Sequence, residues 1–200
     1  AREQAISWSD TGGNLWLFGG YGFDGATQTT IDLNDLWEYS TKTNQWTWVS
    51  GSNVGGAKGT YGTLGAASST NVPGSREFGS SWIDASGNLW LFGGYGYDAN
   101  KIRGRLEDMW EFSPSNQQWT WVAGNKQANT SGTYGTQGTP AASNTPGARN
   151  GGATWVDTSG NLWLFGGNGY DSSGTLGELN DLWKFSPTTK QWTWVSGRNK

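Results

Sequence analysis

One seven-residue stretch, Asn-Leu-Trp-Leu-Phe-Gly-Gly, occurs three times in the sequence without a change. It covers residues 14–20, 88–94 and 161–167, so successive copies begin 74 and 73 residues apart. A nearly constant interval of this size indicates that the chain repeats one supersecondary unit. The run is apolar at consecutive positions, too short for a buried helix and ended by a glycine pair, which favours a strand buried on both faces. We therefore predict three copies of one β unit.

The composition favours a packed all-β domain. The 200 residues include 15 Trp, five in each copy, and 33 Gly, with neither Cys nor His. Aromatic residues at fixed spacing argue for a core rather than for disorder. The net charge is −3 and basic residues do not cluster, which argues against a nucleic-acid partner. No apolar run suits a membrane helix and no cleavable targeting segment opens the sequence. The compartment stays open, with a secreted or periplasmic location slightly preferred.

Each copy divides into four predicted strands, which in the first copy cover residues 2–8, 14–20, 34–39 and 45–49. The third strand alternates with period two, and the fourth places two tryptophans on one face. The connection between the first two strands begins with an aspartate in every copy, which we predict to cap a hairpin turn rather than to act in catalysis. One antiparallel meander cannot bury both of its faces, so the copies must stack. The three turn aspartates are Asp10, Asp84 and Asp157.

The spacing of these elements resembles the kelch repeat. That pattern places a glycine pair after an apolar strand, then an aromatic residue, then Trp after six intervening residues. The resemblance implies four-stranded blades of a β-propeller. The copies are longer than the ~50 residues of a kelch repeat, and most of the excess follows the fourth strand. The matching residues are Gly19-Gly20, Tyr39 and Trp46; Gly93-Gly94, Phe112 and Trp119; and Gly166-Gly167, Phe185 and Trp192.

We expect one all-β domain, a β-propeller of four-stranded antiparallel blades with three blades per chain. The interblade insertions share Gly-Thr-Tyr-Gly-Thr, so we expect them to have a defined conformation without a core of their own. The predicted blades are residues 1–51, 75–124 and 148–200, and the predicted insertions are residues 52–74 and 125–147.

Meander topology assigns the long connections to one rim of the molecule. The insertions and the loops 21–33, 95–107 and 168–179 leave by this long-loop rim, and the short turns leave by the other. Long loops on a rigid scaffold usually carry binding function. In the alternative, the tyrosines pack the loops against the blades and the aspartates cap local turns. The candidate contacts are Tyr21, Phe23, Asp24, Tyr61, Tyr95, Tyr97, Asp98, Tyr134, Tyr170 and Asp171.

An arginine opens the first strand of every copy. In one interpretation these arginines line the mouth of the channel and recognise an acidic group. In the other they tie adjacent blades to carboxylates, because a charge repeated with the unit usually serves the unit. The arginines are Arg2, Arg76 and Arg149, and the carboxylates are Asp35, Asp108 and Asp181.

Three blades do not close a propeller, which usually has about four to eight. An open stack would expose tryptophan-rich faces and strand edges. The sequence starts just before a first strand and stops inside an insertion, so it contains whole blades. We expect a homodimer in which two chains close one six-bladed ring. The alternatives are a fragment of a longer chain and a deliberately built repeat protein.

For function, we predict a non-enzymatic scaffold without a cofactor or metal. Some kelch propellers are copper-radical oxidases, but that chemistry requires His ligands and a modified Cys, and Ser-His-Asp hydrolysis also requires His. The resemblance instead implies a protein-binding module that acts through the long-loop rim. Two alternatives stay open: carbohydrate binding by exposed Trp and Tyr, and an excised or engineered repeat without a ligand.

Overall fold

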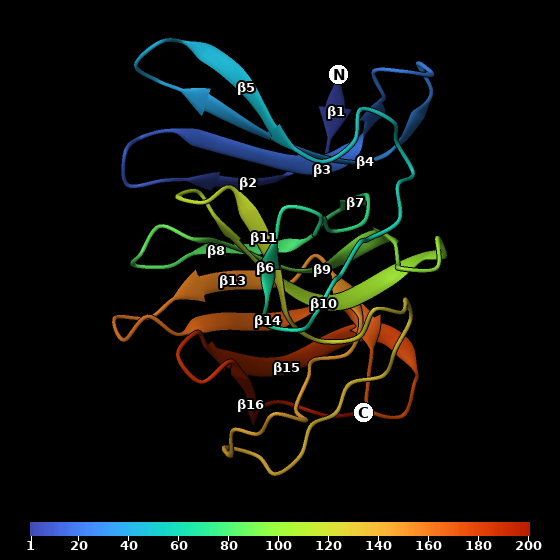
Figure 1. Cartoon of the computed structure of the whole chain (residues 1–200). Coiled ribbons are helices and arrows are strands. Elements are labelled where there is room, and N and C mark those ends of the chain that lie inside the picture. Colours follow the sequence, from blue (N-terminus) through green and yellow to red (C-terminus); the bar gives the residue numbers. More distant parts are fainter.

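The structure, a computed structural model, describes all 200 residues and consists of strands without any helix. Three antiparallel sheets lie one upon the next in chain order (Figure 1). In the first sheet, blade 1, β1 (Arg2–Glu3) and β2 (Ile6–Ser9) both pair with β3 (Leu15–Phe23), followed by β4 (Thr30–Ser40) and β5 (Gln45–Ser50). The predicted all-β, propeller-like stack is confirmed, and its sheets are not closed into a ring. The chain has no helix that could cross a membrane.

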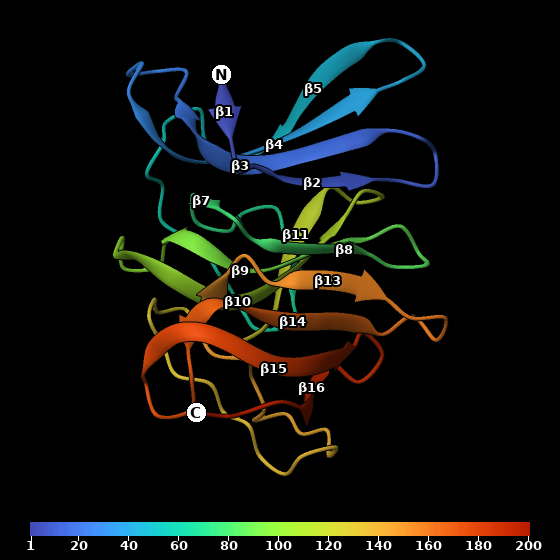
Figure 2. The same cartoon turned by 180° about the vertical axis from the view of Figure 1, so that it is seen from behind.

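The other two sheets repeat this order. Seen from behind, the first and third sheets lie at opposite ends of the stack (Figure 2). Blade 2 contains β7 (Arg76–Glu77), β8 (Ser80–Ile83), β9 (Leu89–Tyr97), β10 (Arg103–Ser113) and β11 (Gln118–Ala123), with β6 (Ala67–Ser68) added at its outer edge. Blade 3 contains β12 (Arg149–Asn150), β13 (Ala153–Val156), β14 (Leu162–Tyr170), β15 (Leu176–Ser186) and β16 (Gln191–Ser196).

We predicted that the glycine pair ends the second strand of each blade, but in the structure this strand continues past the pair. Gly19 and Gly20 have φ values of 62° and 91°, and the register between β3 and β4 shifts beside them. The pair therefore forms a bulge, which only glycine tolerates at these angles, and β3 continues to Phe23. The loop that we expected over residues 21–33 shrinks to residues 24–29.

The hydrophobic core lies between the blades. We call the face of a blade that contacts the next blade its forward face, and the opposite one its rear face. Phe18 of the forward face of blade 1 meets Trp119 of the rear face of blade 2 edge-on at 5.4 Å, and Phe92 meets Trp192 in the same way at 5.2 Å. Each blade thus has two apolar faces and needs a neighbour on both sides. The first interface joins Ile6, Trp8, Trp16, Phe18 and Leu36 to Leu89, Leu91, Trp110, Phe112 and Trp119.

Each insertion crosses to the outer edge of the blade that follows it. β6, in the first insertion, pairs with β11 through the partners Trp119 and Ser68. In the second insertion, Ala141 forms the corresponding bridge to Trp192 of β16. The insertions therefore have the defined conformation that their repeated sequence predicts, and each covers the outermost strand of the next blade.

Candidate functional site

Five of the aromatic residues predicted for the long-loop rim lie at the ends of strands rather than in loops. They occupy the last residues of β3, β9 and β14, because these strands run past the glycine bulge. Phe23 is 58% exposed, whereas the tyrosines are half-buried. The half-buried tyrosines are Tyr21, Tyr95, Tyr97 and Tyr170.

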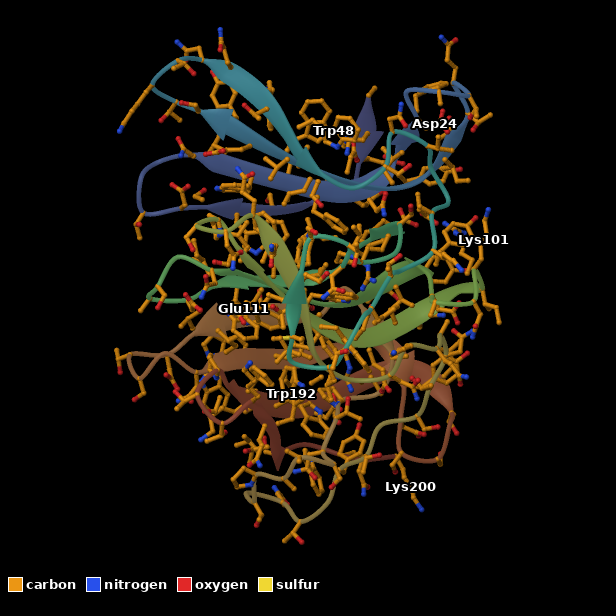
Figure 3. All side chains as sticks on the ribbon, in the orientation of Figure 1. Asp24, Trp48, Lys101, Glu111, Trp192 and Lys200 are labelled. Carbon is orange, nitrogen blue, oxygen red and sulfur yellow. The ribbon has the colours of Figure 1, made fainter.

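Exposed apolar side chains nevertheless recur at this rim, one in each blade. Phe23, Ile102 and Leu176 are 58%, 55% and 46% exposed. Each lies beside the connection between the two longest strands of its blade, which are β3 and β4, β9 and β10, or β14 and β15. Figure 3 labels Asp24 in the first of these connections and Lys101 in the second. Contiguous exposed apolar patches mark protein-binding surfaces, whereas single exposed apolar side chains are common on any protein.

The rim aspartates Asp24, Asp98 and Asp171 are buried and cap turns. One carboxylate oxygen of Asp24 accepts the Thr27 backbone N–H at 2.6 Å, and the other accepts the Gly55 N–H of the insertion at 3.1 Å. The Thr27 hydroxyl also binds this carboxylate and is the largest contribution that lowers the pKa of Asp24, to about 2. Asp98 bonds its own turn and the next insertion, and Asp171 bonds its turn. The arrangement matches the turn-capping alternative.

The repeated arginines form ion pairs inside their own blades. Arg76 of β7 binds Asp108 of β10 through two hydrogen bonds of 2.6 and 2.8 Å, and both side chains are fully buried. Arg76 also donates to the Gly93 carbonyl at 3.0 Å. Each arginine thus binds the carboxylate that the second interpretation named, but the pair lies within one blade. The prediction that these arginines tie adjacent blades is therefore wrong. The equivalent pairs are Arg149–Asp181 and the partly exposed Arg2–Asp35.

A tyrosine of each insertion completes a buried pair. The Tyr61 hydroxyl donates to Asp108 at 2.7 Å, and the Tyr134 hydroxyl donates to Asp181 at 2.5 Å. Both tyrosines are only 4% exposed. Burial, and then the charge of Asp108, raises the pKa of Tyr61. These two predicted rim contacts are instead core residues that anchor the insertions, because the insertions fold onto the next blade.

Two arginines that the sequence analysis did not single out connect the blades to one another. Arg103 of β10 binds Asp32 of β4 at 2.6 and 3.0 Å and lies 4.5 Å from the centre of the Tyr95 ring. Arg105 donates to the Asn168 carbonyl of blade 3 at 3.1 Å. Both arginines occur only in the second copy, so a search for residues that recur in every copy does not find them. The sequence signal that could have identified them is the presence of arginine at these positions in one copy alone.

A groove of about 960 Å³ lies between β11 and the second insertion. Its walls are rich in amides and hydroxyls, and they include Trp121 with the Lys126 amine 4.5 Å from the ring centre. Glu107 also lines it. Burial raises the pKa of Glu107 to about 7, only partly offset by the Thr130 hydroxyl and the Asn125 backbone. A carboxyl group that titrates near neutrality beside a groove is a mark of many functional sites.

The rear face of blade 1 has no neighbour. Leu15 and Trp46 on this face are 43% and 52% exposed. The equivalent residues of blade 2, Leu89 and Trp119, are 0% and 1% exposed because blade 1 and an insertion cover them. Figure 3 shows Trp48 on the same outer side of the first sheet.

The forward face of blade 3 is open in the same way. Trp155 and Phe165 are 44% and 45% exposed, against 4% and 0% for Trp82 and Phe92 in blade 2. The Trp82 indole N–H donates to the Trp163 carbonyl of the next blade at 2.9 Å. The indole N–H of Trp155 has no such acceptor. The forward face of blade 3 and the rear face of blade 1 therefore carry residues equivalent to the two sides of the contact between neighbouring blades inside the stack.

No model of a known protein family matches the sequence, and no curated protein matches it. The chain is similar to a solved structure, "Structure of YjhT", with a TM-score of 0.61 and 18% sequence identity over 98% of the chain. The match covers 52% of YjhT, so the chain spans about half the length of that protein. At this identity the likeness shows a shared fold, that of an all-β protein built from propeller-like blades.

Proposed function

We propose that the chain is a non-enzymatic, kelch-type propeller scaffold that closes a six-bladed ring with a second copy and binds protein partners through the long-loop rim. The observation that carries this proposal is the pair of open faces. The forward face of blade 3 and the rear face of blade 1 carry residues equivalent to those that pack against each other at both interfaces inside the stack. In a twofold dimer each open face meets its complement.

The proposed junction would repeat a hydrogen bond that is found at both interfaces inside the stack. Trp8 donates to the Trp90 carbonyl at 3.1 Å, as Trp82 does to the Trp163 carbonyl. At the junction, Trp155 of one chain would donate to the Trp16 carbonyl of the other. The similarity to half of a longer solved chain also supports a half-ring of three blades.

Light scattering coupled to size exclusion tests the ring. We expect a mass of twice the 21.6 kDa of one chain. Phe165→Lys places a charge on the open face of blade 3 and should give the single-chain mass with an unchanged circular dichroism spectrum. Leu64→Lys is the matched control, because Leu64 is 55% exposed in the first insertion and should leave the dimer intact. A wild-type mass of one chain would overturn the ring.

Binding of protein partners rests on the three exposed apolar residues of the long-loop rim. A variant with Phe23, Ile102 and Leu176 all changed to Ser removes the three exposed apolar side chains of the long-loop rim, and light scattering of the variant shows whether the dimer is kept. In affinity capture with cross-linking, the wild type should retain proteins that this variant loses. Equal capture by both proteins would contradict the rim as the binding surface.

Carbohydrate binding is a second candidate, favoured by the amide- and hydroxyl-rich groove of about 960 Å³. Trp121 is its aromatic residue, but Lys126 lies 4.5 Å from the centre of its ring and Tyr61 meets it edge-on. A sugar would have to displace Lys126 to stack there. A glycan-array signal that Trp121→Ala abolishes would favour this function over protein binding.

A further inference from the structure

The tyrosine that anchors each insertion fills the same site on the next blade, and blade 1 has this site without an occupant. In blade 2 the Tyr61 ring lies 4.8 Å from Trp110 and meets Trp121 edge-on at 5.4 Å. In blade 3 the Tyr134 ring lies 4.8 Å from Trp183 and 5.3 Å from Trp194. Two independent segments therefore occupy one kind of site in one geometry.

The backbone of each insertion is held along the outer strand by repeated hydrogen bonds. The N–H groups of Gly65 and Gly138 donate to the carbonyls of Trp121 and Trp194, both at 2.8 Å. In both insertions an asparagine side chain donates to the carbonyl of the other strand tryptophan. These bonds are Asn71 to Trp119 at 3.0 Å and Asn144 to Trp192 at 3.1 Å.

Blade 1 presents every receptor group of this site. Asp35 accepts hydrogen bonds from Arg2 and from the indole N–H of Trp37, as Asp108 does from its own arginine and tryptophan, but Asp35 receives none from a tyrosine. A cavity of about 320 Å³ lined by Arg2, Leu17, Trp37 and Trp46 lies open there. Trp46 is 52% exposed, whereas its counterparts in the filled sites are each 1% exposed.

We propose that blade 1 binds, in trans, an extended uncharged peptide segment of the Gly-Thr-Tyr-Gly-Thr type. The tyrosine ring packs between Trp37 and Trp48, and its hydroxyl donates to Asp35. The segment that follows lies along the free edge of β5, where its N–H groups reach the carbonyls of Trp46 and Trp48, a mode of strand addition. Arg2 neutralises Asp35 within the site, which favours an uncharged occupant.

This site adjoins the proposed ring junction, because Trp46 lines the site and lies on the rear face of blade 1, but it does not depend on the junction. Its receptor groups belong to one blade, and Tyr61 and Tyr134 already occupy the equivalent sites of blades 2 and 3. The tyrosine of the bound segment would add to the apolar contacts at the rear face of blade 1, as Tyr61 does in the core between blades 1 and 2. The peptide site can therefore exist in a protein that stays a single chain in solution.

Titration calorimetry with a synthetic peptide tests the proposal. A peptide with the sequence of residues 59–73, which has no charged side chain, should bind with one site per chain. Changing its tyrosine to Phe removes a hydrogen bond to a charged group and should weaken binding roughly tenfold or more. Changing the same tyrosine to Ala should abolish binding.

Two variants of the protein localise the binding. Trp48→Ala, at a side chain that is 51% exposed, should lose the peptide while the protein stays folded. Trp155→Ala, on the other open face, should bind the peptide as the wild type does, even if it no longer dimerises. Absence of binding to folded wild-type protein, equal binding of the Tyr→Ala peptide, or full binding by Trp48→Ala would each overturn the proposal.

Discussion

At the scale of single residues, buried polar groups hold the insertions in place. The Tyr134 hydroxyl donates to Asp181, whose carboxylate also binds Arg149 at 2.7 and 2.8 Å. Burial alone would raise the pKa of Asp181, but Arg149 and Tyr134 together lower it. The sequence places a tyrosine at constant phase in each insertion, yet its partner carboxylate lies 47 residues further along the chain. Only the folded chain brings the two together.

We predict that Tyr134→Phe lowers the free energy of unfolding by about 1–3 kcal/mol, because it leaves a buried acceptor without one donor. Tyr39→Phe is the matched control, since the Tyr39 hydroxyl bonds Asn44 at the exposed end of a hairpin. That change should stay within about 0.5 kcal/mol. Urea unfolding of both variants measures the difference. Equal losses would show that the insertion tyrosine has no special role.

Glu107 departs from the repeat at a buried position. The equivalent Asn34 donates its side-chain amide to the Pro73 carbonyl at 3.1 Å. One carboxylate oxygen of Glu107 is buried without any hydrogen-bond partner. A carboxylate cannot donate as the amide does, which agrees with the raised pKa of Glu107, about 7. Burial without a hydrogen-bond donor therefore explains the raised pKa of Glu107, and no catalytic role in the groove is required.

The stability of the chain should consequently fall as Glu107 ionises. The pKa is raised from 4.5 to about 7 in the folded state, so the cost is absent below pH 4.5, grows between these values and is constant above pH 7. We predict that Glu107→Gln raises the free energy of unfolding by about 3 kcal/mol at pH 8 and by almost nothing at pH 4. Urea unfolding at both pH values checks this. The same gain at both would contradict it.

At the scale of elements, the glycine pair shows how far a sequence pattern predicts a strand. The shortness and the continuous apolar character of the run before the pair predict a strand, and the pair itself predicts the end of that strand. Gly93 has a φ of 64°, and a β-carbon there would lie 2.6 Å from the Arg149 carbonyl of blade 3. The pair thus serves both the bulge and the close approach of the next blade. The second role depends on a contact between blades that the local sequence does not encode.

We predict that Gly93→Ala destabilises the protein by more than about 3 kcal/mol, because strain at positive φ adds to a backbone clash. Gly160→Ala is the control, since Gly160 has a φ of 80° with nothing within 4 Å of the added carbon. It should cost only the backbone strain, about 1–2 kcal/mol. Thermal and urea unfolding compare the two. Similar losses would mean that contact between blades adds nothing at this glycine.

At the scale of the whole molecule, charge distinguishes the interfaces inside the stack from the proposed ring junction. Arg103 of blade 2 binds Asp32 of blade 1 across their interface. At the junction of two chains the equivalent positions are Thr30 of one chain and Glu178 of the other, so the cation is missing. The ring junction should therefore be weaker than the interfaces within a chain.

We predict that Thr30→Arg strengthens the dimer by about 1 kcal/mol, roughly fivefold in the dissociation constant, and less at high salt. Thr30→Gln adds similar length without charge and should leave the affinity unchanged. Sedimentation at several protein concentrations measures both variants. A Thr30→Arg protein that dissociates as readily as the Gln variant would contradict the geometry of the proposed junction.

The sequence by itself determined the three β units, their stacking and the turn roles of the first aspartates, because strand periodicity and turn chemistry are local properties. The Asp10 carboxylate indeed binds the Asn14 backbone and the Trp16 indole within its own hairpin. Only the tertiary structure decided that Tyr61 is buried, that each insertion covers the following blade and that Arg103 spans two blades. These outcomes depend on which surfaces meet, and those surfaces lie tens of residues apart in the chain.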